Sequence, residues 1–198
     1  ILTLTILITV FELAAQKQYN KWYTSSVTAI GVDFNTNPPS YLSNSSITSS
    51  GEGSTGICDS GGEVIFYTEG VNVYNRNNVI AQNGILLPAA GVNIETTTQN
   101  AIIIPFADTN YYGLIINDGE SSGTGTGLYY SIFDRTLDGG LGGINNVKNI
   151  HFFSGTNVSD TIDEKLVAIR HANGCDFWIV TVRNDDYYAF RFTSPSDY

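Results

Sequence analysis

Short apolar runs alternate along the chain with stretches rich in glycine, asparagine and serine. β-Branched and aromatic residues dominate the runs, and each run has the length of a β-strand. They cover residues 64–68, 101–106, 111–116, 128–133, 177–182 and 187–192. Apolar residues do not recur at i, i+3 and i+4 over several turns, so we predict an all-β protein.

Short connectors join the runs, and many runs are apolar at consecutive positions. The connectors at 59–63, 107–110 and 172–176 suit turns and are too short for crossover helices, which predicts antiparallel hairpins. Consecutive apolar positions predict strands that are buried on both faces of their sheet. A sandwich covers only one face of each sheet, whereas radial packing covers both, so we predict a β-propeller with four-stranded antiparallel blades.

The order strand, tight turn, strand, turn, strand occurs at 55–80 and again at 100–133 and 165–193. The first strands of these copies start about 45 and then about 65 residues apart, and propeller blades repeat every 40 to 50 residues or so. This spacing predicts about three to four blades within residues 16–198. A propeller with only three to four blades would leave blade edges exposed. We therefore expect that the propeller is incomplete here and that the chain continues after Tyr198.

The first residues have the character of a targeting segment. Residues 1–11 are apolar apart from threonines, and the small residues Ala14 and Ala15 follow before the sequence turns polar. The apolar stretch is shorter than the roughly 20 residues of a membrane-spanning helix, which favours a signal peptide at 1–15 with its basic n-region missing. A buried strand is the alternative. The signal peptide predicts a secreted or outer-surface protein with no membrane insertion after cleavage.

The charge of the chain argues against two classes of binding partner, and its cysteine content leaves disulfide formation undecided. The chain has 19 acidic and 9 basic residues, a formal net charge of -10, so we expect neither nucleic acid nor an anionic membrane as a partner. We expect Cys58 and Cys175 to be small buried residues. An exported protein permits a disulfide between them, but their separation in sequence does not decide whether they pair.

A series of motifs carries a resemblance to a known group of proteins. The motifs lie at 21–23, 31–35, 59–70, 73–75, 98–105, 129–142 and 164–176. In this order they resemble the N-terminal propeller-like region of large secreted Bacteroidota proteins. Those proteins typically carry polycystic-kidney-disease-like modules and a type IX secretion, gliding-motility-associated sorting domain. The resemblance implies a WD40-like or YVTN-like propeller at the cell surface and supplies no catalytic residue; Thr24-Ser25 departs from the family's Phe-Gly.

Two glycine patterns match catalytic motifs on paper. Residues 51–56 fit G-x-G-x-x-G, but a strand is predicted after them in place of the helix that a dinucleotide site requires. Residues 119–123 fit G-x-S-x-G within a predicted hairpin loop, and His151 and His171 follow, which leaves a hydrolase formally open. The two histidines match no zinc spacing, and we expect His171 to bond to backbone at a turn. We therefore predict no metal and no cofactor.

Paired carboxylates occur only in predicted turns and loops, where such side chains usually accept hydrogen bonds from backbone amides. The pairs are Asp134 with Asp138, Asp160 with Glu164, and Asp185 with Asp186. A glycosidase needs two carboxyl groups at a defined separation, which sequence does not supply. We predict no catalytic constellation.

Several polar residues are candidates for modification or ligand binding. Asn44 and Asn157 fit the N-glycosylation pattern, and Thr161 lies in a pattern that resembles the O-glycosylation signal of Bacteroidota. The hydroxyl side chains of the loop at 118–127 are candidate ligand contacts. They are Ser121, Ser122, Thr124 and Thr126.

The function predicted from these patterns is an exported module that binds or adheres, or that acts as a scaffold for downstream modules, without catalysis. Its partner is an extracellular ligand, either a glycan or a protein. The alternative is an extracellular glycan-active enzyme or the accessory propeller of one.

Overall fold

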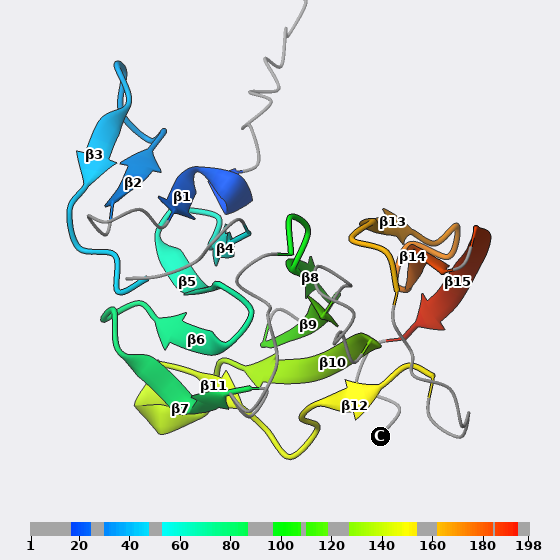
Figure 1. Ribbon diagram of the computed structural model, residues 1–198. Coiled ribbons are helices and arrows are strands. Elements are labelled where there is room, and N and C mark those ends of the chain that lie inside the picture. The colour runs from blue at the N-terminus through cyan, green and yellow to red at the C-terminus, as the bar shows by residue number, and fades with distance from the viewer. Residues whose placement is uncertain are drawn as a thin grey trace, which may run out of the picture.

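The computed structural model describes residues 17–24, 30–47, 53–86, 97–107, 110–118, 127–153, 162–183 and 185–193 (Figure 1). The signal peptide predicted at 1–15 lies outside these residues. No helix in the described ranges is long and apolar enough to cross a membrane.

Three sheets contain the described strands. The first follows a short 3-10 helix, η1 (Lys17–Tyr19), and comprises β1 (Lys21–Thr24), β2 (Ile30–Asp33) and β3 (Ser40–Leu42). The second comprises β4 (Thr55–Cys58), β5 (Val64–Thr68), β6 (Asn72–Asn75), β7 (Ile80–Ile85), β8 (Ala101–Pro105), β9 (Tyr111–Asp118), β10 (Gly127–Asp134), β11 (Gly143–Ile144) and β12 (Ile150–His151), with η3 (Asp138–Gly140) before β11. The third comprises β13 (Leu166–Arg170), β14 (Phe177–Arg183) and β15 (Asp186–Phe192).

The second sheet contradicts the predicted β-propeller. Its strands follow the order β4-β5-β6-β7-β11-β10-β9-β8, with β12 paired to β10, and the end strands β4 and β8 contact each other. This arrangement is a nearly closed eight-stranded mixed barrel accompanied by two small sheets, and the described strands do not divide into separate four-stranded blades. The two-residue strand β11 links β4–β7 to β8–β10 within this sheet. It pairs in parallel with β7 through Gly143 and Gln82. It covers the edge of β7 that would otherwise be unpaired.

The predicted all-β content and hairpins are confirmed. The connectors at 59–63 and 172–176 join β4 to β5 and β13 to β14 as antiparallel pairs. The hairpin predicted around 107–110 joins β8 to β9. Asp59 closes the first turn, since its Oδ1 accepts hydrogen bonds from the backbone N–H groups of Gly61 and Glu63 at 2.8 and 3.0 Å. Local turn chemistry was therefore readable from sequence.

Burial on both faces is confirmed for the barrel strands β5, β9 and β10 and wrong for the third sheet. In β5 and β10 nearly every side chain is buried. Burial alternates along β13 and over residues 177–180 of β14, and Val167, Ile169 and Trp178 are exposed. The third sheet packs one face on the barrel and presents the other to solvent, as antiparallel sheets commonly do.

Aromatic and aliphatic contacts hold the barrel and the small sheets together. Phe66 of β5 stacks on Phe133 of β10, with ring centroids 4.0 Å apart, inside the core that the barrel strands share. Phe192 of β15 contacts Phe106, 5.4 Å between centroids, in the core that joins the third sheet to β8, β9 and β10. The sheets therefore share apolar cores.

A carboxyl group lies buried beside the β5–β6 turn. Oε1 of Glu69 accepts hydrogen bonds from the backbone N–H and the side-chain amide of Asn72 at 3.0 and 2.7 Å. Oε2 has no hydrogen-bond partner among the described residues. Burial raises the pKa of Glu69, against the opposing effect of these hydrogen bonds.

Replacing this carboxyl group tests its contribution to stability. A raised pKa means that the folded chain binds the proton more tightly than the unfolded chain, so stability is lost as pH rises from the ordinary glutamate pKa of 4.5 through the folded pKa. Glu69→Gln keeps an acceptor for Asn72 and removes the charge. We expect a higher thermal midpoint than wild type at pH 8 and a flatter dependence of the midpoint on pH between 5 and 8. A lower midpoint for the variant at both ends of this range would contradict the assignment.

Candidate functional site

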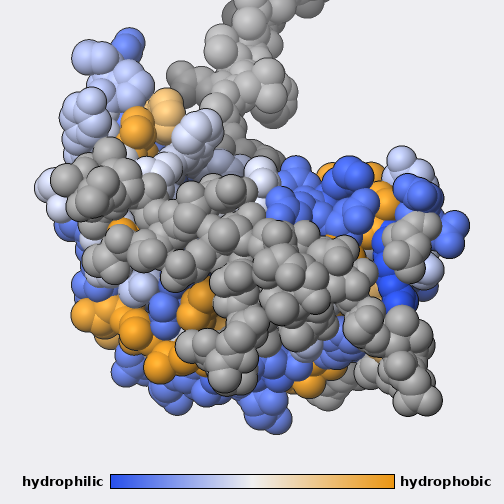
Figure 2. All heavy atoms as spheres, in the orientation of Figure 1, coloured by the Kyte–Doolittle hydropathy of each residue, from blue (hydrophilic) through white to orange (hydrophobic). Residues whose placement is uncertain are grey.

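Exposed aromatic side chains gather on one face of the β1–β3 sheet. We call Tyr19, Trp22, Phe34 and Tyr41 the aromatic face; their exposed fractions are 51%, 56%, 42% and 83%. Trp22 pairs across the sheet with Val32, which pairs with Tyr41, so these side chains share one surface. In Figure 2 the surface over β2 and β3 is mostly pale, which marks intermediate hydropathy, with a few hydrophobic atoms beside it.

The ring of Trp22 is fixed from two sides. Its Nε1 donates a hydrogen bond to the carbonyl oxygen of Tyr19 at 2.9 Å. Phe34 meets it edge to face, with centroids 5.0 Å apart and an interplanar angle of 61°. The polar atom of the indole is thus satisfied, and the exposed surface that it offers is apolar ring.

The other face of β1 attaches the sheet to the barrel. Tyr23 stacks on Tyr67 of β5 with centroids 4.0 Å apart and ring planes 3° from parallel. The Tyr67 hydroxyl donates to Oδ1 of Asn78 and accepts from the backbone N–H of Ser46, both at 2.9 Å. Burial raises the pKa of Tyr23, with a smaller contribution from Tyr67. This stack sets which residues of β1 point outward.

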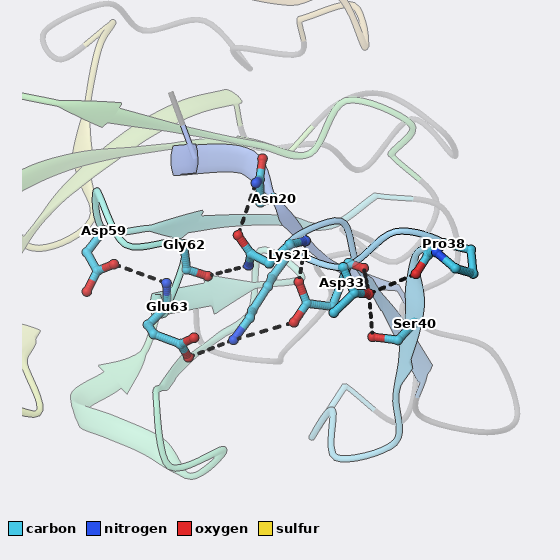
Figure 3. A network of polar contacts seen from close by, with 10 residues as sticks. Asn20, Lys21, Asp33, Pro38, Ser40, Asp59, Gly62 and Glu63 are labelled. Atoms are coloured by element: carbon cyan, nitrogen blue, oxygen red, sulfur yellow. Dashed lines mark hydrogen bonds and ion pairs between the residues drawn. The ribbon is translucent and has the colours of Figure 1, made fainter. Parts of the chain in front are cut away.

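A group of polar contacts, which we call the polar joint, reinforces the attachment of the β1–β3 sheet to the barrel. It consists of Lys21 of β1, Asp33 of β2 and the turn at 59–63 (Figure 3), together with Asn35, which follows β2. The Lys21 ammonium lies 2.7 Å from Oε2 of Glu63 and 3.8 Å from Oδ2 of Asp33. The Lys21 side chain is buried, so the two carboxylates supply the charge partners that such a group requires.

The amide of Asn35 continues the joint. Its Nδ2 donates to the carbonyl oxygen of Gly62 at 2.9 Å, and its Oδ1 accepts from the side-chain amide of Asn20 at 3.1 Å. Gly62 has φ +89°, and a Cβ at this position would overlap the Asn35 side chain. The turn and the hairpin therefore approach more closely than a side chain at residue 62 allows.

A small pocket of about 180 Å³ borders the aromatic face. Tyr19 and Trp22 line it together with residues of β1 and β4, including Thr24 and Thr55. The Ser54 hydroxyl donates to the carbonyl oxygen of Tyr23 at 2.5 Å and ties β1 to the segment before β4. The pocket extends the aromatic face inward and is large enough only for a small substituent.

Of the residues predicted from sequence as ligand or modification sites, the structure describes Asn44, which is not part of this face. Asn44 is exposed after β3. The hydroxyl of Ser46, which completes its glycosylation pattern, donates to the carbonyl oxygen of Asn78. The remaining candidates lie outside the described residues and stay predictions: Ser121, Ser122, Thr124, Thr126, Asn157 and Thr161.

The cysteines do not pair. Cys58 is buried as predicted, whereas Cys175 is exposed, and both thiols are free. Cys175 lies in the β13–β14 turn, where its backbone N–H donates to Oδ1 of Asn173 at 3.1 Å, so it packs in no core. Burial raises the pKa of the Cys58 thiol.

The candidate catalytic residues have structural contacts. Nδ1 of His171 accepts from the backbone N–H of Asn173 at 3.1 Å, which confirms its predicted role at a turn. Oδ1 of Asp134 accepts from the backbone N–H and hydroxyl of Thr136 at 2.8 and 2.7 Å. β4 begins at Thr55, within the pattern at 51–56, so the pattern leads into a strand as predicted, while 119–123 lies outside the described residues. Over the described part of the chain, no three metal-ligating side chains cluster.

Comparison with known proteins adds no relatives: no family model, curated protein or solved structure matches the chain. The resemblance to secreted Bacteroidota proteins therefore stays a prediction. Sequence reasoning missed the aromatic face, although one signal was present. In a strand, consecutive residues point to opposite faces, so Trp22 and Tyr23 had to lie on different sides of β1.

The close approach at Gly62 predicts a stability difference between two glycine variants. Gly174 has φ +77°, and a Cβ at this position would meet no neighbour within 4 Å, so Gly174→Ala adds backbone strain alone, about 1 kcal/mol. Gly62→Ala adds the overlap with Asn35, and we expect it to lower the free energy of unfolding by at least about 2 kcal/mol. Urea denaturation measures both values. Equal losses of unfolding free energy in the two variants would show that the polar joint tolerates a larger distance between residue 62 and Asn35.

Proposed function

We propose that the chain is an extracellular, non-catalytic binding module that holds a neutral glycan on the aromatic face. The observation that carries the proposal is the exposure of Trp22 and Tyr41 in register across the β1–β3 sheet. Large aromatic side chains are usually covered in a folded chain, and a cluster of exposed ones is typical of a binding surface.

A glycan suits the chemistry of this surface. The C–H groups on one side of a sugar ring carry partial positive charge and pack on the negative face of an aromatic ring. The Trp22 indole N–H is already bonded to Tyr19, so its contribution is stacking. Nearby, the Thr36 hydroxyl lies 3.1 Å from the Ser40 hydroxyl, and the Asn20 amide bonds to Asn35 at the surface, which supplies neutral partners for sugar hydroxyls.

The contacts behind the aromatic face support recognition by a preformed surface. The Tyr23–Tyr67 stack and the Lys21–Glu63 ion pair hold the sheet from behind. A ligand therefore orders few side chains on binding, which lowers the entropic cost of association. The formal net charge of -10 favours a neutral glycan over a polyanionic one for this face.

Titration with soluble neutral polysaccharides tests the proposal. We expect isothermal titration with at least one member of a panel of xylan, mannan, β-glucan and arabinogalactan to show binding. Trp22→Ala and Tyr41→Ala should each weaken it about tenfold or more, since each removes a stacking surface. Tyr187→Ala is the matched control, because Tyr187 is 81% exposed on β15, away from the face.

The same panel separates binding from hydrolysis. We expect no increase in reducing ends after prolonged incubation. Release of reducing ends that Asp134→Asn abolishes would replace the binding module with the glycan-active enzyme. Failure of every polysaccharide to bind, or binding that both aromatic variants retain in full, would overturn the glycan proposal.

A further inference from the structure

A second pocket, of about 410 Å³, lies where three turns meet, and it shares no residue with the pocket beside the aromatic face. Its polar lining comes from Asp59 and Glu63 in the β4–β5 turn, Arg76 and Asn77 after β6, and Arg135 after β10. We call it the arginine pocket. Its volume lies within the range of small-molecule sites.

Within each turn that lines the pocket, an Asp or Asn side chain accepts a hydrogen bond from a backbone N–H group of the same turn. Asp59 Oδ1 accepts two backbone N–H bonds within the first turn. Asn75 Oδ1 accepts from the backbone N–H of Asn77 at 2.9 Å, and Asp134 Oδ1 from that of Thr136 at 2.8 Å. In the last two turns an arginine follows the Asx residue directly. The fold therefore presents Arg76 and Arg135 from rigid turns at strand ends.

Neither guanidinium has a carboxylate partner in the part of the chain that the structure describes. The chain has 19 acidic residues for 9 basic ones, so partners are plentiful, and Lys21, Lys165 and Arg191 each form an ion pair. Among the described residues no carboxylate oxygen lies within ion-pair distance of Arg76 or Arg135. Arg76 donates from Nη2 to the carbonyl oxygen of Gly140, which uses only part of its hydrogen-bonding capacity.

Two acidic side chains, Asp59 and Glu63, also line the pocket, and neither lies within ion-pair distance of the arginines. Glu63 is paired with the Lys21 ammonium at 2.7 Å. Asp59 accepts its turn hydrogen bonds on Oδ1 only, which leaves Oδ2 for a ligand. Arg135 contacts Tyr112: burial raises the pKa of this tyrosine, and the charge of the guanidinium and its hydrogen bond to the tyrosine oppose the rise. The pocket thus combines two guanidinium groups that lack a carboxylate partner among the described residues with the Oδ2 atom of Asp59 and the Asn77 amide.

We propose that the arginine pocket binds a sugar acid, with Arg76 and Arg135 holding the carboxylate. A guanidinium matches a carboxylate through two parallel N–H bonds, which a neutral sugar does not offer. Asp59 Oδ2 accepts from a ring hydroxyl, and the Asn77 amide donates to or accepts from another. The site is independent of the aromatic face.

Titration with galacturonate, glucuronate, glucose and acetate tests this site, followed by isothermal calorimetry or by amide shifts in NMR. We expect at least one uronate to bind, glucose not to bind, and acetate to bind more weakly than the uronate. Arg135→Gln and Arg76→Gln should each weaken uronate binding about tenfold or more, because each removes a charge-assisted hydrogen bond.

Arg170→Gln is the matched control. Arg170 is exposed and donates from Nη1 to the carbonyl oxygen of Gly174 at 2.8 Å, as Arg76 does to Gly140, but it does not line the pocket. Its variant should bind the uronate as wild type does. Thermal midpoints near that of wild type show that each variant is folded, and Arg76→Lys, which keeps the charge, should retain part of the affinity.

Three results would overturn the sugar-acid site: no uronate binds, both arginine variants bind as wild type does, or acetate binds as tightly as the uronates. The outcome does not depend on the aromatic face, since Trp22→Ala should leave uronate binding unchanged. Loss of uronate binding in Trp22→Ala would also contradict an independent site.

Discussion

The stack of Tyr23 on Tyr67 is the contact on which the proposed binding surface depends. Three short strands form a small sheet, and a sheet of this size needs an apolar face packed on something else. Tyr23 supplies that face, with ring centroids 4.0 Å from Tyr67. Because side chains alternate along a strand, burying Lys21 and Tyr23 places Trp22 and Thr24 outside. One aromatic contact therefore decides which residues meet a ligand.

The turn at 59–63 takes part both in the contacts that attach the β1–β3 sheet to the barrel and in the lining of the arginine pocket. Lys21 reaches across to Glu63 of the turn, and Gly62 of the same turn accepts from Asn35. Asp59, at the start of the turn, lines the arginine pocket. The two proposed sites thus share a rigid element without sharing a ligand. Glycans that carry both neutral and acidic sugars offer chemistry that suits both surfaces.

Sequence predicted local structure well and long-range pairing poorly. Strands such as β5 and β8, and the Asp59 turn, follow from β-branched runs and turn chemistry within a few residues. The barrel depends on Gly143 pairing in parallel with Gln82, which no local pattern signals, so the propeller prediction was wrong. The aromatic face combines Trp22 with Tyr41, and the arginine pocket combines Asn75-Arg76 with Asp134-Arg135. Each pair is distant in sequence, and only the fold brings its members together.

Tryptophan fluorescence tests the central claim most directly, because the chain has 2 tryptophans, Trp22 and Trp178. In Trp178→Phe, where Trp22 is the remaining emitter, titration with a bound neutral polysaccharide should give a saturable change in emission. In Trp22→Phe the emission of Trp178 should stay constant. A saturable change reported by Trp178 alone would place the ligand on the third sheet and contradict the aromatic face as the binding surface.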